Sequence, residues 1–262
     1  MATKKKLLQA AAGSAGGEAL NVEDVFSTYL YEGFGTSTDK QIVNGVNLAD
    51  EGGMVWIKSR TTTQDNTIFD TERGVHGYIV PNKTDAQYTP SGDRGLQSYN
   101  TDGFTIPSTS YFGGFDQASS DLASWTFRKA PKFFTCLTYT GTGPASGANE
   151  QQVSHDLGVK PAVVIIKRTD STGDWWFFTD VIDGSNDYGY LNQTAAFGNS
   201  SNNVPTDSVF NVGGTLNVSG ATYVAYLFAH NDGDGTFGPT GDQDIIKCGS
   251  YTGNGSSTGP EI

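Results

Sequence analysis

The 262-residue chain carries a formal net charge of −12 and contains 34 glycines, with 17% charged and 36% hydrophobic residues. This acidic balance argues against a nucleic-acid-binding surface, because phosphate contacts require clustered lysine and arginine side chains. No apolar run reaches the about 18 residues that a membrane-spanning helix needs. Glycine-, serine-, threonine- and asparagine-rich stretches between short apolar runs are typical of an all-β protein.

The first 25 residues differ in kind from the rest. The stretch "KKKLLQAAAG" (4–13) favours helix, "SAGG" (14–17) interrupts it, and "LNVEDVF" (20–26) predicts a further helical turn. A helix this short is not stable alone in water. We therefore expect the segment to become ordered on a partner, with a mobile tail as the alternative. The apolar side chains that such docking would bury are Leu7, Leu8, Leu20, Val22, Val25 and Phe26.

An internal repeat organises the remainder of the chain. The pattern Tyr-x-Gly-x-Gly occurs three times, starting at Tyr31, Tyr139 and Tyr251. Longer segments recur in the same order after the first two occurrences: "MVWIKSR" (54–60) with "VVIIKRT" (163–169), "TIFDTERG" (67–74) with "WWFFTDVIDG" (175–184), "TDGFTI" (101–106) with "TDSVFNV" (206–212), and "LASWTFRK" (122–129) with "YVAYLFAH" (223–230). Recurring segments in a fixed order predict an internal duplication, in which Trp125 corresponds to Tyr226.

The third occurrence predicts the first strand and turn of a third unit. We accordingly expect the natural protein to be longer, with the alternative that this terminal strand completes the sheet of the second unit. The expected divisions are a docking segment (1–25), a first repeat (26–134), a second repeat (135–230), an acidic glycine-rich linker (231–243) and the start of a third repeat (244–262).

Each unit has six to eight short strand-like segments separated by turn residues, which predicts a two-sheet antiparallel sandwich of jelly-roll or lectin-like type. The uniformly apolar "AVVIIK" (162–167) predicts a central strand that is covered on both faces. The stretch "YVAYLFAH" (223–230) alternates, which predicts a strand with one solvated face.

Signals for catalysis are weak. The three histidines, His76, His155 and His230, stand beside no nucleophile motif, and neither G-x-S-x-G nor H-E-x-x-H is present. The carboxylate pairs Asp70/Glu72 and Asp180/Asp183 could in principle serve glycoside hydrolysis. They fall at repeated strand-to-turn junctions, where aspartate commonly caps turns. We predict that the chain is not an enzyme.

Two further clusters are candidate binding sites. Four carboxylates in the predicted linker are an oxygen-rich set of the kind that Ca²⁺ takes, although their spacing departs from the EF-hand pattern and a plain acidic linker is the favoured interpretation. They are Asp232, Asp234, Asp242 and Asp244. We predict no other metal and no cofactor, because Cys136 and Cys248 are too few for a disulfide framework or a zinc site.

Aromatic residues of the second unit form the other cluster. Successive strand residues point to opposite faces, so one of two adjacent tryptophans should be buried and the other exposed. An exposed tryptophan could stack on a sugar. The candidate glycan-contact residues are Trp175, Trp176, Tyr188 and Tyr190; Trp56, Tyr111 and Phe112 are the aromatics considered in the first unit.

Several blocks, above all "WTFRKAPKFF" (125–134) and "NDGDGTFGPTGDQDIIKCGSYTGNG" (231–255), resemble virion proteins of tailed bacteriophages, particularly marine and cyanobacterial ones. The resemblance spans essentially the whole chain and implies a structural or tail-fibre-like protein with tandem β-rich repeats. It implies docking of residues 1–25 on other virion proteins of the tail, portal adaptor or baseplate. It also implies a homotrimer, assembly in the host cytoplasm and no catalytic residues. The alternatives are a carbohydrate-binding, lectin-like module and a head-surface decoration or head-fibre protein.

Overall fold

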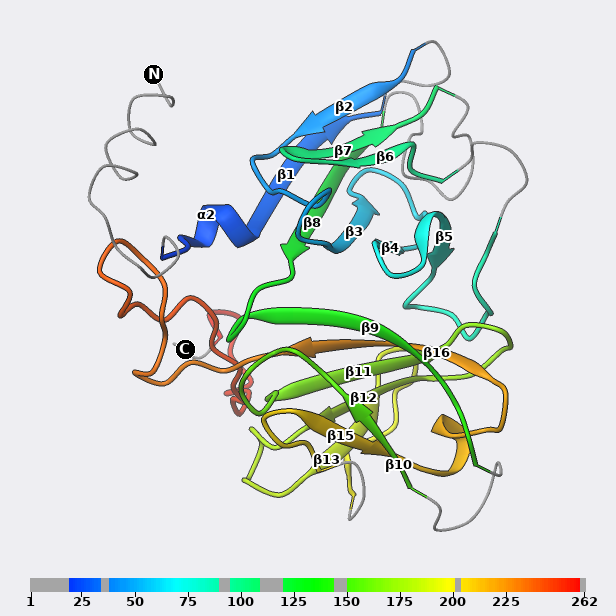
Figure 1. Cartoon of the computed structure of the whole chain (residues 1–262), viewed down its shortest axis with the longest axis vertical. Helices are drawn as coiled ribbons and strands as arrows, with labels where there is room; N and C mark the ends of the chain where they lie inside the picture. Colours follow the sequence, from blue (N-terminus) through cyan, green and yellow to red (C-terminus); the bar gives the residue numbers. More distant parts are fainter. Residues whose placement is uncertain are drawn as a thin grey trace.

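The computed structural model describes residues 19–33, 38–89, 95–108, 120–143, 150–200 and 204–259. Over these residues the protein is all-β, as predicted, with sixteen strands in four sheets (Figure 1). All strand pairs in the sheets are antiparallel. The helices of the described residues are α2 (Val22–Val25) and the 3₁₀ helix η1 (Gly214–Leu216), and none of them is long and apolar enough to cross a membrane.

The first eight strands form a sandwich of two sheets, which we call the first inner sheet and the first outer sheet. The inner sheet has the order β1 (Phe26–Glu32), β8 (Asp121–Arg128), β3 (Gly53–Ser59), β4 (Thr67–Asp70), β5 (Gly74–Ile79). The outer sheet has the order β2 (Lys40–Val43), β7 (Gly103–Ile106), β6 (Ser98–Asn100).

The last eight strands form the second inner and second outer sheets. The inner sheet has the order β14 (Gly198–Asn199), β13 (Asp187–Tyr190), β12 (Trp175–Thr179), β11 (Val163–Arg168), β16 (Thr222–Phe228), β9 (Phe134–Thr140). The outer sheet pairs β10 (Gln151–Ser154) with β15 (Val209–Val212).

The two sandwiches share one strand order except at β14, which lies beside β13 in the inner sheet, whereas the matching β6 lies beside β7 in the outer sheet. When β1 to β8 are matched in chain order to β9 to β16, the inner order β1-β8-β3-β4-β5 reads as β9-β16-β11-β12-β13. The register agrees as well, since Met54 pairs with Phe127 and the corresponding Val163 pairs with Phe228. The duplication stays a prediction, and this shared order supports it.

The four sheets are stacked in layers, with the two inner sheets facing each other (Figure 1). In β3, Met54 and Trp56 belong to a central core between the inner sheets, while Val55 belongs to the core under the first outer sheet. In β11, Val163 lies in the central core and Val164 lies under the second outer sheet. The prediction that "AVVIIK" forms a strand covered on both faces is therefore confirmed.

The prediction for "YVAYLFAH" is wrong, because β16 has no solvated face. Residues 223–227 are all buried, alternating between the central core and the second outer core. The alternation predicted one solvated face, yet the hydroxyls of the tyrosines in this strand form hydrogen bonds inside the protein. Tyr223 donates to the carbonyl of Thr215 at 2.8 Å, and Tyr226 donates to the carboxylate of Asp70 at 2.6 Å.

A buried ion pair of the first sandwich is bonded to a tyrosine of the second in the central interface. Asp70, at the end of β4, is fully buried, and its Oδ2 accepts a hydrogen bond from Nε of Arg73 at 2.7 Å. The same oxygen accepts the hydroxyl of Tyr226 from the other sandwich. Nη1 of Arg73 also donates to Gln87 at 3.3 Å. Burial opposes the charge of Arg73, but Asp70 holds the pKa of the guanidinium above its usual value.

Further bonds tie the second inner sheet to the loop after β5. The indole of Trp175 donates to the carbonyl of Val80 at 3.0 Å. The amide of Gln87 donates to Thr169, and the amide of Gly173 donates to Thr84, both at 2.8 Å. Because a buried indole and two backbone amides are paired across this boundary and the inner sheets share one core, the two sandwiches form one packed body and are not modules strung on a flexible connection.

The N-terminal docking prediction needs correction for three residues. Val25, the last residue of α2, is 0% exposed in the central core, and Leu20 and Phe26 pack against that core. Burial of their apolar surface thus stabilises the chain itself and is not left for a partner. Val22 is 44% exposed. Leu7 and Leu8 lie outside the described residues.

The predicted linker is also packed into the protein. Phe237 is 2% exposed in the central core, and the amide of Gly238 donates to the carbonyl of Leu20 at 2.7 Å. The buried side chain of Asn231 accepts hydrogen bonds from the amides of Ile245 and Ile246 at 3.2 and 3.3 Å. Residues 231–243 therefore pack against the N-terminal segment at Leu20 and contribute to the central core. Their acidic composition did not predict this packing.

The predicted first strand of a third repeat is absent from the described residues 244–259. Tyr31 and Tyr139, which stand in paired strands, are 7% and 8% exposed, whereas Tyr251 is 66% exposed. The physical reason is pairing: β9 hydrogen-bonds to β16 over its whole length, but no described strand lies beside residues 246–252. An unpaired strand leaves its backbone groups unsatisfied, so its sequence pattern alone does not form one.

We predict that Arg73→Leu lowers the free energy of unfolding by about 3–5 kcal/mol, because it leaves the Asp70 carboxylate buried without its cation. Urea unfolding of the purified protein measures this change. Lys83→Leu is the matched control, since it breaks the exposed pair with Asp65 and should cost at most about 1 kcal/mol. Equal losses in the two variants would show that the interface does not depend on the buried pair.

Candidate functional site

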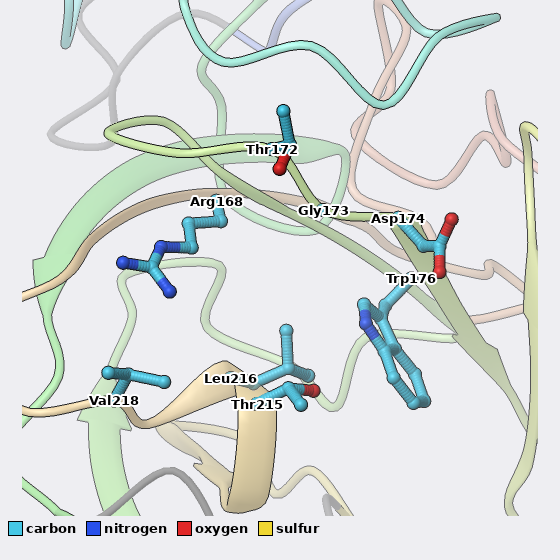
Figure 2. Close-up of a pocket in the computed structure, with 8 residues that line it drawn as sticks. All are labelled: Arg168, Thr172, Gly173, Asp174, Trp176, Thr215, Leu216 and Val218. Atoms are coloured by element: carbon cyan, nitrogen blue, oxygen red, sulfur yellow. The ribbon is translucent and has the colours of Figure 1, made fainter.

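The second sandwich contains an open cleft of about 310 Å³. It lies between the turn that joins β11 to β12 and the short helix η1, on the side of the inner sheet that faces β10 and β15 (Figure 2). The residues that line it are Arg168, Thr172, Gly173, Asp174, Trp176, Thr215, Leu216 and Val218.

Strand alternation in β12 sends two adjacent tryptophans to opposite faces. Trp175 is fully buried in the central core, so it cannot contact a glycan. Trp176 is half-buried, packs against the outer core and lines the cleft. The sequence predicts one buried and one exposed tryptophan; Trp175 is buried, whereas Trp176 is half-buried and not exposed.

Neighbouring aromatic rings hold Trp176 in place. Tyr190 is its cross-strand partner in β13, with ring centroids 4.7 Å apart in an edge-to-face contact. Tyr188 and Phe178 lie 5.6 and 5.9 Å from the same ring. Three of the four predicted glycan-contact residues are thus brought together, but Tyr188 and Tyr190 support the tryptophan and do not line the cleft. Tyr111 and Phe112 lie outside the described residues.

Polar groups surround the indole. Arg168, at the end of β11, is held by Asp170 through two hydrogen bonds of 2.9 and 3.0 Å, and this bonding lowers the pKa of the Asp170 carboxyl. Asp174 accepts a hydrogen bond from Asn192 at 2.9 Å through Oδ1. Thr172 stands in the turn above the cleft and Thr215 stands in η1 below it (Figure 2).

Sequence reasoning missed these polar residues because they lie in a turn and a single 3₁₀ turn, where no periodicity marks a face. One difference between the matching strand pairs of the two sandwiches does mark the position of the cleft. The cross-strand partner of Ile166 is Trp176, whereas the partner of the corresponding Ile57 is Thr67. The indole is therefore specific to the second sandwich, although the surrounding strand order is common to both.

Lys167 lies directly behind the cleft. Its side chain is fully buried, and Nζ donates to the carbonyls of Thr84 and Gly173 at 3.2 and 3.0 Å. Burial lowers the pKa of this amine to about 8, against the opposing pull of Asp174 and Asp85. Lys58, at the matching position of the first sandwich, is half-buried and donates to Ser59 and Thr62.

The carboxylate pairs considered for catalysis have structural partners. Glu72 forms an ion pair with Lys129 at 3.2 Å, and Asp180 pairs with Lys160. Asp183 accepts the amide of Ser185 at 2.8 Å. With Asp70 buried in the central interface, neither pair forms two carboxylates that face a common cleft.

The four carboxylates considered for a cation are used within their loop. The two oxygens of Asp244 accept the amides of Gly233 and Gly235 at 2.7 and 2.9 Å. Asp232 forms an ion pair with Lys247, Asp234 accepts the amide of Asp232 at 3.1 Å, and Asp242 accepts the hydroxyl of Thr240. Across the part of the chain that the structure describes, no group of three or more histidine, cysteine, aspartate or glutamate side chains could hold a metal ion.

Residues 21–262 match a family described as a domain of unknown function, DUF7483, and the chain belongs to this family. No curated protein and no solved structure matches it.

We predict that Lys167→Met removes a pH dependence of stability. A buried amine with a folded-state pKa of about 8, against 10.5 in the unfolded chain, binds fewer protons when folded. Relative to Lys167→Met, the native protein should therefore gain stability as the pH rises from about 8 to 10.5, where the amine of the unfolded chain also loses its proton. Urea unfolding from pH 7 upwards measures the difference between variant and native protein. Lys58→Met is the control, and a native curve that stays flat would contradict the prediction.

We also predict that Asp244→Ala lowers the melting temperature more than Asp242→Ala does, because only Asp244 bonds two backbone amides of the loop. Neither calcium nor a chelator should change the melting temperature of the native protein. A rise with calcium that disappears in Asp244→Ala would instead identify a cation site.

Proposed function

We propose that this DUF7483 member is a structural component of a bacteriophage virion, of the tail-fibre, spike or tail-appendage kind. Two things support the proposal. The first is the resemblance carried by residues 125–134 and 231–255. The second is the central interface, which joins two sandwiches into one body and is the single observation that most favours a mechanical role.

The interface suits such a role because it resists separation of the two sandwiches. Phe127 of β8 contacts Phe134 and Phe228 of the other inner sheet, with centroids 5.5 Å away in both cases. Aromatic contacts of this kind add about 0.5–1.5 kcal/mol each to the burial of apolar surface. Pulling the sandwiches apart would also break the bond that the Tyr226 hydroxyl donates to Asp70 and would expose the Asp70–Arg73 pair to water. An appendage that transmits force needs joints of this strength between its parts.

Within the proposal, the residues before α2 attach the protein to the particle. Leu20, Val25 and Phe26 are packed in or against the central core and are not available to a partner. Within the proposal, Leu7 and Leu8 therefore supply the apolar contacts to other virion proteins. The net charge of −12 keeps the rest of the surface repulsive and soluble. A homotrimer and a place on the tail are parts of the same proposal, with a head-surface decoration as the alternative location.

The experiment is to follow the protein into particles. Mass spectrometry of purified virions should detect the chain, and antibodies against the second sandwich should label the tail by electron microscopy. A deletion of residues 2–18 should abolish incorporation and leave the melting temperature of the purified protein unchanged, because this deletion spares Leu20 and α2.

A deletion within the same chain provides the control. Removing residues 255–259, which form no strand, should leave incorporation intact. Purified virions that lack the native chain would overturn the structural role. Particles that incorporate the 2–18 deletion at native levels would overturn docking through Leu7 and Leu8, and labelling on the head would favour the decoration alternative.

A further inference from the structure

We propose that the cleft at Trp176 binds a neutral saccharide. The inference does not depend on a place in a virion, because it concerns a site that the isolated protein would carry.

The indole offers an unused surface and an unused donor. Trp175 and Trp56 donate their indole N–H groups to Val80 and Asn66, but that of Trp176 has no hydrogen-bond partner among the described residues. Figure 2 shows the nitrogen on the edge of the ring that faces Arg168 across the cleft. A sugar ring presents C–H groups on its face and hydroxyls on its rim, which matches an aromatic plane with a polar edge.

The remaining polar groups are placed for hydroxyl recognition. The hydroxyls of Thr172 and Thr215 and the Oδ2 atom of Asp174 have no hydrogen-bond partner among the described residues, whereas Asn192 fixes Oδ1. Free acceptors and donors on anchored side chains fit the many hydroxyls of a saccharide. The apolar side of Leu216 completes the mixture of apolar wall and few polar groups that is usual for ligand sites.

Charge argues for a neutral ligand. Arg168 is the basic residue that lines the cleft, and Asp170 neutralises it through two hydrogen bonds. Asp174 carries a negative charge beside the indole, and the Lys167 ammonium that attracts it is buried and bonded to the carbonyls of Thr84 and Gly173. A nucleotide could stack on Trp176, but its phosphates would meet no free cation here and would be repelled by Asp174. Acidic sugars are disfavoured for the same reason.

The size of the cleft and its restriction to one sandwich complete the argument. A cleft of 310 Å³ stands at the lower end of the about 300–1,000 Å³ usual for ligand sites, which suits a terminal sugar and not a long chain. The first sandwich has Thr67 where the second has Trp176. The fold that the two units share therefore does not require an indole at this strand position.

The test is a titration of the full chain with small saccharides, followed by tryptophan fluorescence and calorimetry. The neutral probes are the methyl glycosides of glucose, mannose and galactose and free N-acetylglucosamine; the acidic probes are glucuronic acid and N-acetylneuraminic acid. At least one neutral probe should bind at millimolar concentration or below, and the acidic probes should bind more weakly. Trp176→Ala should weaken binding by at least about tenfold.

Two variants keep the test decisive. Asp174→Asn should weaken binding without removing the ring, which covers the case in which Trp176→Ala does not fold. Tyr251→Ala alters an aromatic side chain that is exposed away from the cleft and should leave binding unchanged. The proposal is overturned if no neutral probe binds, if acidic probes bind more tightly, or if binding survives in both cleft variants. Loss of virion incorporation has no bearing on these outcomes, so the two proposals fail separately.

Discussion

The structure depends on one constraint, the burial of two β-sheets against each other. A sheet that is apolar on both faces must be covered twice, and here each inner sheet is covered once by its own outer sheet and once by the other inner sheet. The Asp70–Arg73–Tyr226 contact lies inside this shared core. Both charges belong to the first sandwich, and the hydroxyl of Tyr226 supplies a further hydrogen bond to the buried carboxylate from the second sandwich.

The two sandwiches use matching faces for this contact. Met54 and Trp56 point into the central core from β3, and the corresponding Val163 and Ile165 point into it from β11. Each unit therefore buries the apolar inner face of the other, and neither inner face is left exposed. The two sandwiches are joined by burial and hydrogen bonds and not only by the intervening chain.

Differences between the units indicate where binding can arise. Positions that fill the cores keep their apolar character in both, as Phe69 and Phe178 do in β4 and β12. Trp176 has Thr67 at the matching position of the first unit, whereas the bond from Asn192 to Asp174 recurs there as the bond from Asn82 to Asp65. A duplicated scaffold can vary at an open edge without disturbing its cores, because side chains that line a cleft make fewer packing contacts than core residues.

The sequence by itself determined the all-β class, the two sets of strand segments and the opposite fates of Trp175 and Trp176, because these follow from alternation and turn residues that act locally. Only the tertiary structure decided that both faces of β16 are buried, that Val25 and Phe237 enter one core, and that Tyr251 stays exposed. It also decided that Arg168, Asp174 and Thr215 gather around an indole. The physical reason is that a residue pattern reports which face of a strand is apolar, whereas the sheet, helix or loop that covers this face is brought there by residues far away in the chain.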